Sequence, residues 1–227
     1  MFLETTWSLL IFALVPLAVK FTDANPYDIG LMRLLMAVVL LAFFWRRKIE
    51  WKAYKKVGFS KIVLLGICFF LHWITYTFAV KWAGPSMTVL GMSSYGVQLM
   101  LWGALFLGNK ITAKSMLCLV AIIFGVFLVI PEWDFANNGT LGLILALLSA
   151  TFYSFIPVIL QKTKEFKTET RIFFQFFIAL FGYLFLLGKT DLQILKAEDW
   201  YALIFLGVFG TFIAHTLWSK VTSVIST

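Results

Sequence analysis

Acidic side chains are scarce in this chain and are confined to a few places. Only 11 of its 227 residues are Asp or Glu, and all of them lie in the gaps between long apolar stretches or at the ends of those stretches. Ionisable groups deep in a membrane protein often form proton relays. The sequence therefore shows no carboxylate relay of the kind common in pumps.

Cysteine is nearly absent as well. Cys68 and Cys118 both lie within apolar stretches. Two such thiols form neither a disulfide framework nor a metal-ligand spacing. We interpret them as small packing residues, and we expect neither a bound metal nor a cofactor.

Charged residues of either sign make up only 13% of the chain, whereas hydrophobic residues make up 61%. A soluble domain has about 25% and about 45–50%, respectively. The net charge of +8 could suggest a nucleic-acid partner, but the basic residues lie in the gaps between apolar stretches and form no single soluble face. This pattern is typical of membrane orientation and excludes nucleic acid as the expected partner.

The abundant feature is the long apolar run. A hydrocarbon core of about 30 Å needs about 20 helical residues, and lipid leaves no partner for open backbone groups. The runs are continuous and do not alternate as barrel strands would. We therefore predict an all-α polytopic membrane protein with eight transmembrane helices. Their approximate ranges are 5–20, 29–45, 61–80, 84–107, 114–131, 139–160, 171–188 and 200–220.

The gaps between these runs alternate in charge. Fourteen of the 19 basic residues fall in the gaps after the second, fourth and sixth runs or at the end of the eighth, and four fall on the other side. Because cytoplasmic loops carry the Lys/Arg excess, we expect a cytoplasmic N-terminus in the inner (plasma) membrane. The start of the chain lacks the basic region of a signal peptide, so we interpret the first run as a helix.

The chain also contains an internal repeat. Five runs form a first copy, residues 1–131, and three form an incomplete second copy, residues 139–227. An odd number of helices per copy gives the copies opposite orientations, as in many transporters. We therefore expect part of a ten-helix inverted repeat of five plus five that lacks its last two helices; the alternative is an eight-helix protein. When the sequence is compared with itself at an offset of 141 residues, identical residues coincide at several places: Ser8 with Ser149, Pro16 with Pro157, Gly66 with Gly207 and Thr75 with Thr216.

The best motif stretch runs from residue 72 to residue 130. It contains Tyr76-Thr77-Phe78-Ala79 and Ala104-Leu105-Phe106-Leu107-Gly108, and Gly139-Thr140-Leu141-Gly142 opens the second copy. With these motifs the chain resembles the EamA-type family of the drug/metabolite transporter (DMT) superfamily. The resemblance implies carrier-type transport of a small metabolite.

Three ionisable residues within the runs are candidates for substrate binding. His72 and His215 lie near the middle of their helices, and each could bind substrate or a proton; the alternative is a neutral imidazole hydrogen-bonded to a neighbouring helix. Arg33 could bind a carboxylate or phosphate, or its side chain could snorkel to the interface. With Lys20 and Lys81 it could form a ring of cations at the outer mouth.

The fourth run is the most polar and supplies further candidates, Ser94, Tyr95 and Gln98. Ser94 and Gln98 are four residues apart and therefore share a helix face. Trp73 and Tyr76 in the third run could add an aromatic surface. The alternative for the polar residues is hydrogen bonding between helices.

The sequence favours a carrier that moves an amino acid or other small organic solute by alternating access, through facilitated transport or exchange. No nucleophile–base pair, metal set or acidic cluster indicates an enzyme. The alternatives are a non-transporting or degenerate membrane protein and a membrane-embedded lipid-modifying enzyme. The expected partners are the solute and membrane lipid, and a homodimer is left open.

Overall fold

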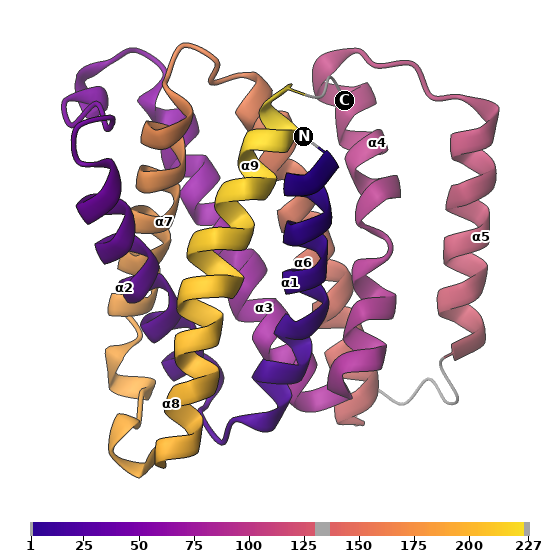
Figure 1. Cartoon of the computed structure of the whole chain (residues 1–227). Coiled ribbons are helices and arrows are strands. Elements are labelled where there is room, and N and C mark those ends of the chain that lie inside the picture. Colours follow the sequence, from indigo (N-terminus) through magenta and orange to yellow (C-terminus); the bar gives the residue numbers. More distant parts are fainter. Residues whose placement is uncertain (1, 130–136, 225–227) are drawn as a thin grey trace.

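The chain is described by a computed structural model that covers residues 2–129 and 137–224. Within these ranges the protein is helical, with short connections and no strand (Figure 1). The major elements are α1 (Phe2–Phe21), α2 (Pro26–Trp45), α3 (Phe59–Met92), α4 (Tyr95–Leu107), α5 (Ala113–Val129), α6 (Asn138–Gln161), α7 (Thr168–Leu184), α8 (Ala197–Ile204), the π-helix η4 (Phe205–Ile213) and α9 (Ala214–Val224). Short 3₁₀ turns are η1 (Ala53–Lys55), η2 (Leu187–Lys189) and η3 (Leu192–Ile194).

These elements form eight rods in the described part of the chain, which confirms the predicted polytopic helical fold. Gly84 (φ 81°) divides α3 into two helices. The second of these continues into α4 as the fourth rod, and α8, η4 and α9 together form the eighth rod. Of the described helices, five are long and apolar enough by themselves to cross a membrane: α1, α2, α3, α6 and the rod from Ala197 to Val221.

Local sequence explains where several helices begin and end. Asn25 caps α2, because its side-chain oxygen accepts hydrogen bonds from the backbone N–H groups of Tyr27 and Asp28, both at 2.9 Å. Pro26 suits the first turn of a helix, where no partner for its missing N–H is needed. Gly84 adopts the positive φ that reverses the chain before Pro85. Because α2 begins earlier than its apolar run, Asp28 lies buried in its first turn.

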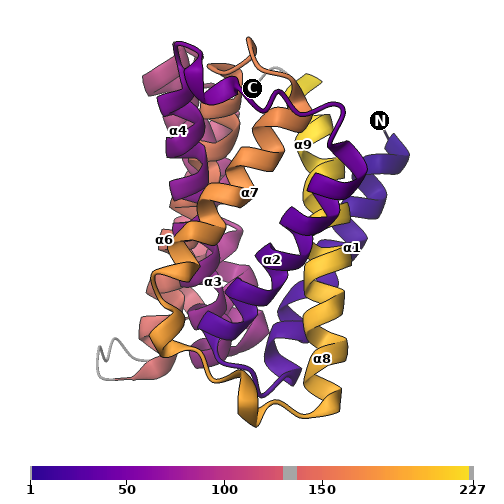
Figure 2. The same ribbon diagram turned by 90° about the vertical axis from the view of Figure 1, so that its left-hand side faces the viewer.

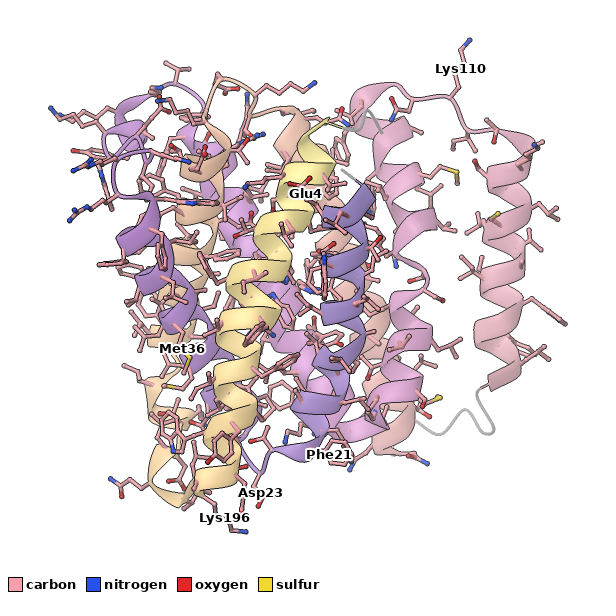
Figure 3. The ribbon with its side chains drawn as sticks, in the orientation of Figure 1. Glu4, Phe21, Asp23, Met36, Lys110 and Lys196 are labelled. Carbon is pink, nitrogen blue, oxygen red and sulfur yellow. The ribbon has the colours of Figure 1, made fainter. Side chains whose placement is uncertain are left out.

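The loops gather at two opposite ends of the bundle. At one end the backbone N–H of Glu50 donates to Thr170, and Lys61 donates to the carbonyl of Lys162. Lys110 lies at the same end, at the top of Figure 3, together with Glu4 near the start of α1. The connections that follow the second, fourth and sixth rods therefore share one end, as the charge pattern predicts.

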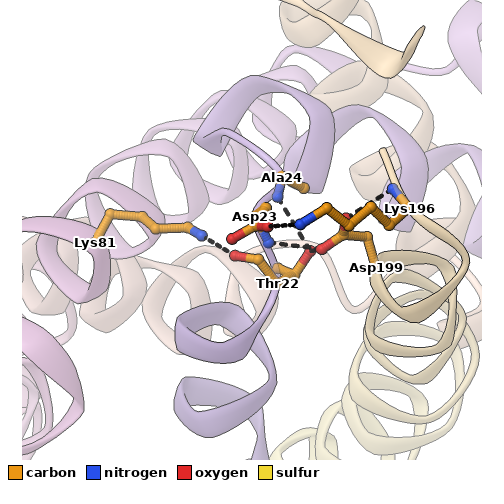
Figure 4. A network of polar contacts seen from close by, with 6 residues as sticks. All are labelled: Thr22, Asp23, Ala24, Lys81, Lys196 and Asp199. Atoms are coloured by element: carbon orange, nitrogen blue, oxygen red, sulfur yellow. Dashed lines mark hydrogen bonds and ion pairs between the residues drawn. The ribbon is translucent and has the colours of Figure 1, made fainter. Parts of the chain in front are cut away.

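A polar network closes the opposite end (Figure 4). The carboxylate of Asp199 accepts hydrogen bonds from the Thr22 hydroxyl at 2.8 Å, the Asp23 backbone N–H at 2.6 Å and the Lys196 backbone N–H at 2.9 Å. The Lys81 ammonium donates to the carbonyl of Thr22, and Lys196 pairs with Asp23 at 3.3 Å. This network ties the connection between α1 and α2 to the start of α8.

The centre of the bundle is a close contact between α3 and α6, which we call the α3–α6 seam. A Cβ atom on Gly142 would lie 2.5 Å from the Cβ of Ala83, and one on Gly91 would lie 2.5 Å from the Cβ of Ala146. Small residues permit such close approach between membrane helices. Figure 2 shows the neighbouring layer, in which α2 crosses between α7 and the α8–η4–α9 rod.

Helix α5 lies apart from the other helices and has α4 as its neighbour (Figure 1). Leu117, Val120 and Phe124 are among its many exposed apolar side chains. Apolar side chains exposed along a whole helix suit contact with lipid.

Candidate functional site

A cavity of about 200 Å³ lies between α1, both parts of α3, α6 and α9, and we call it the aromatic cavity. Its walls are almost entirely apolar or aromatic, with a few polar groups among them. Phe12 lies near the middle of α1, and His72 lies near the middle of the first helix of α3, so the cavity lies at mid-depth in the bundle. Its lining residues are Phe12, Val15, Pro16, His72, Trp73, Tyr76, Val89, Met92, Tyr153 and His215.

His72 is fixed to α6 across the seam. Its Nδ1 lies 2.8 Å from the hydroxyl and 3.1 Å from the backbone carbonyl of Ser149, and that hydroxyl also lies 3.0 Å from the carbonyl of His72. A carbonyl can only accept, so these contacts fit an imidazole whose Nδ1–H donates to Ser149. The ring stacks on Tyr153, with centroids 4.4 Å apart. The expectation of an imidazole bonded to a neighbouring helix therefore describes His72 well.

His215 has different surroundings. Its ring makes edge-on contacts with Phe12 at 4.8 Å, Phe69 at 5.0 Å and Trp73 at 5.5 Å. Its Nε2 is buried without a hydrogen-bond partner among the described residues. Both histidines line the same cavity, although their helices belong to different halves of the chain.

Arg33 is fully buried, with 0% of its surface exposed. Its Cζ lies 3.1 Å from the centre of the Trp73 ring, and its Nε donates to the Thr211 hydroxyl at 2.8 Å. The snorkelling interpretation of Arg33 is therefore wrong, and so is its place in a ring of cations at the outer mouth. Two turns of α2 precede Arg33, which is enough to carry its side chain into the interior, against α3 and η4.

Trp73 connects Arg33 to the aromatic cavity. It contacts Arg33, lines the cavity and meets the ring of Tyr76 edge-on at 5.2 Å. The predicted aromatic surface of Trp73 and Tyr76 is thus present, and Tyr153 from α6 extends it. Arg33 itself is not a lining residue.

The polar residues of the fourth rod lie next to the cavity and do not line it. The Gln98 amide donates to the Ser94 hydroxyl at 2.8 Å, as their shared face predicts, and to the carbonyl of Leu147 in α6 at 3.3 Å. Tyr95 contacts Tyr153 at 5.2 Å between ring centres. These contacts support the alternative of hydrogen bonding between helices for Ser94 and Gln98, and their role in binding stays a prediction.

Sequence reasoning missed several residues of the site. Phe12 and Met92 gave no signal, because aromatic and apolar residues fill every run. Thr211 accepts from Arg33 and donates to the carbonyl of Leu206, five residues earlier, a spacing that only the π-helix brings into register. A metal-binding group of three or more His, Cys, Asp or Glu does not occur among the described residues.

The helical rods and their apolar surfaces are those of a polytopic membrane protein, and the aromatic cavity lies at mid-depth within it. The model of the EamA-like transporter family matches residues 6–130 and again residues 140–227, so the chain belongs to this family of membrane transporters. None of the curated proteins matches the sequence.

Thirteen chains of solved structures match the fold. One of them, a crystal structure, has a TM-score of 0.71 at 17% sequence identity and covers 97% of this chain and 78% of its own. At this identity the likeness concerns the fold alone.

Proposed function

We propose that this protein is a carrier that moves a small organic solute across the inner (plasma) membrane by alternating access. One observation carries the proposal: both family matches contribute walls to the aromatic cavity, Phe12, His72 and Trp73 from the first and Tyr153 and His215 from the second. Transporters commonly bind solute near the midplane, where two repeats meet. We propose facilitated transport or exchange, unless coupling uses histidine, because the described lining residues include two histidines and no carboxylate.

Three helices that contribute to the cavity contain a proline or a π-helical stretch. Pro16 lies within α1 at the cavity wall, Pro157 lies within α6, and η4 precedes His215. Proline removes a helical hydrogen bond, and π-helical turns occur frequently at functional sites. We propose these positions as the flexible points of alternating access, and residues 1–131 and 139–227 as two oppositely oriented repeats.

The transport proposal is tested by filling the cavity. Met92 lines it, whereas Met116 on α5 is 45% exposed on the outer surface. In proteoliposomes that contain the full chain, we expect exchange of at least one solute from a panel of labelled amino acids and organic acids. Met92→Trp should abolish this exchange and Met116→Trp should preserve it. No exchange of any solute by the wild type, or equal exchange by both variants, would contradict the proposal.

The proposed cytoplasmic N-terminus is tested by thiol labelling. Single cysteines at Lys48, Lys164 and Lys196 would be introduced after replacement of Cys68 and Cys118. An impermeant maleimide applied to intact cells should label position 196 alone. Labelling of positions 48 and 164 alone would reverse the proposed orientation.

A further inference from the structure

Three hydrogen-bond donors in the interior around Arg33 lack a partner among the described residues. They are Nη1 and Nη2 of Arg33 and Nε1 of Trp73, and all three are buried. Most buried polar groups in proteins have a partner, so a cluster of buried donors without one needs an explanation.

No carboxylate among the described residues pairs with these three donors. The described salt bridges all lie at the two ends of the bundle, in loops or in the first turn of a helix. Asp28, the nearest acid along α2, accepts a hydrogen bond from the backbone N–H of Asp191 through Oδ1, and no ion pair joins it to Arg33 among the described salt bridges. An uncompensated guanidinium in a low-dielectric interior is costly, which makes it a functional group by default in a membrane protein.

Arg171, the other buried arginine of the described residues, provides a comparison: its Nε lacks a partner, but its terminal nitrogens do not. Arg171 in α7 donates to the carbonyl of Leu160 at 2.9 Å and to the hydroxyl of Thr168 at 3.0 Å. Both of its terminal nitrogens therefore have protein acceptors. Arg33 has only Thr211, at Nε, which leaves the two nitrogens that form the outer fork of the guanidinium for another partner.

That fork suits an oxyanion, a carboxylate or a phosphate. The two terminal N–H pairs of a guanidinium bind the two oxygens of a carboxylate in parallel. The Trp73 indole lies between Arg33 and the aromatic cavity, because it contacts the guanidinium and also lines the cavity. The remaining walls are apolar and aromatic and suit the body of an organic acid rather than its charge.

We propose that Arg33 binds the carboxylate of the transported solute and that Trp73 is a side-chain gate that covers Arg33 until the solute enters. In the bound state the indole moves off the guanidinium, the carboxylate takes its place, and the apolar body of the solute occupies the aromatic cavity. The freed indole N–H becomes available as a further donor to the solute. This inference rests on the proposed function and assigns its substrate class, an organic carboxylate with an apolar body.

The test uses two probes of nearly the same shape, 3-phenylpropionate and its neutral amide. With the wild-type chain in detergent, we expect the carboxylate to raise the unfolding temperature and to bind about 10- to 100-fold more tightly than the amide, as for hydrogen bonds to a charged group. Arg33→Gln should abolish this preference and Arg33→Lys should retain part of it. Arg171→Gln is the matched control and should keep the full preference.

Each outcome bears on the proposal. Equal binding of both probes by the wild type, binding of neither, or a preserved preference in Arg33→Gln would overturn it. Circular dichroism and gel filtration identify a variant that fails to fold, and Arg33→Lys then decides the question, because it keeps a charge but lacks the fork. Trp73→Phe removes the indole N–H while keeping an aromatic cover, and we expect a partial loss of affinity for the carboxylate.

A proteoliposome experiment separates this inference from the proposed function. If the wild-type chain exchanges solutes without favouring carboxylates, the carrier stands and the role of Arg33 is wrong. If it exchanges no solute of either kind, the proposed function itself fails.

Discussion

Substitution of Gly142 by Ala tests whether the α3–α6 seam holds the bundle together. The added Cβ would lie 2.5 Å from the Cβ of Ala83 and 2.7 Å from its backbone nitrogen. Carbon atoms in good contact are about 3.5–4.0 Å apart, so the two helices must separate by roughly 1 Å. One of the atoms in the way is backbone, which cannot rotate aside. Overpacking of this kind costs about 1–3 kcal/mol.

An opposing effect has to be removed before that cost can be measured. Alanine favours a helix over glycine by about 1 kcal/mol. Gly125 in α5 provides the control, because a Cβ there would meet no atom within 4 Å. The difference between Gly142→Ala and Gly125→Ala therefore isolates the clash, at about 1–3 kcal/mol.

The assay is reversible unfolding in mixed detergent micelles, followed by circular dichroism. Gly142→Ala should unfold at a lower denaturant concentration than Gly125→Ala. Solute binding should also weaken, because Ser149 lies two turns further along the same face of α6 and holds His72. Equal free energies of unfolding for the two variants would refute the close packing of the seam.

Three further predictions concern polar contacts. Ser149→Ala removes the hydroxyl that contacts His72 Nδ1 and the His72 carbonyl, and leaves the Ser149 backbone carbonyl in place. It should lower the free energy of unfolding by about 1–2 kcal/mol in the same micelle assay, and unchanged stability would be the contrary result. Asp199→Ala leaves three donors without their acceptor and should lower the free energy of unfolding by about 1–3 kcal/mol. Hydrogen exchange at residues 22–25 should accelerate. Unchanged exchange would show that the network does not hold the connection between α1 and α2. The hydrogen bond from Lys56 lowers the pKa of Glu50 below its ordinary value of 4.5. Its stabilising contribution is therefore present above pH 4.5 and is lost as the pH falls through the lowered pKa. The wild type should therefore lose more stability than Glu50→Gln on acidification below pH 4.5, and parallel acid profiles would argue against this contribution.

Much of the fold could be predicted from the sequence because lipid imposes a strict rule on the backbone. A run such as 61–80 must become a helix when no water can satisfy its N–H and C=O groups. The turn at Gly84 was visible as a break between two runs, and the basic residues of the loops indicated which connections share an end of the bundle. Helix boundaries were less well determined. Asn25 and Pro26 extend α2 ahead of its apolar run and bring Asp28 inside the helix.

The candidate site was predicted unevenly. His72, Trp73, Tyr76 and His215 all line the cavity. Arg33 was identified as a candidate because it is charged. The snorkelling interpretation placed its side chain at the membrane interface, whereas it lies in the interior against Trp73 and Thr211. Spacing along one helix gave the contact between Ser94 and Gln98, because residues four apart share a face whatever surrounds them.

The sequence by itself determined the number of helices, their approximate limits and their arrangement as connected rods, since these follow from run length and from the cost of open backbone groups in lipid. Only the tertiary structure decided that Arg33 faces Trp73 and Thr211, that His72 reaches Ser149, and that residues from both halves enclose one cavity. These contacts join positions far apart in the chain, and they depend on the rotation of each helix about its axis. In a chain that is apolar on nearly every helix face, hydropathy does not fix that rotation, and close packing at residues such as Gly142 does.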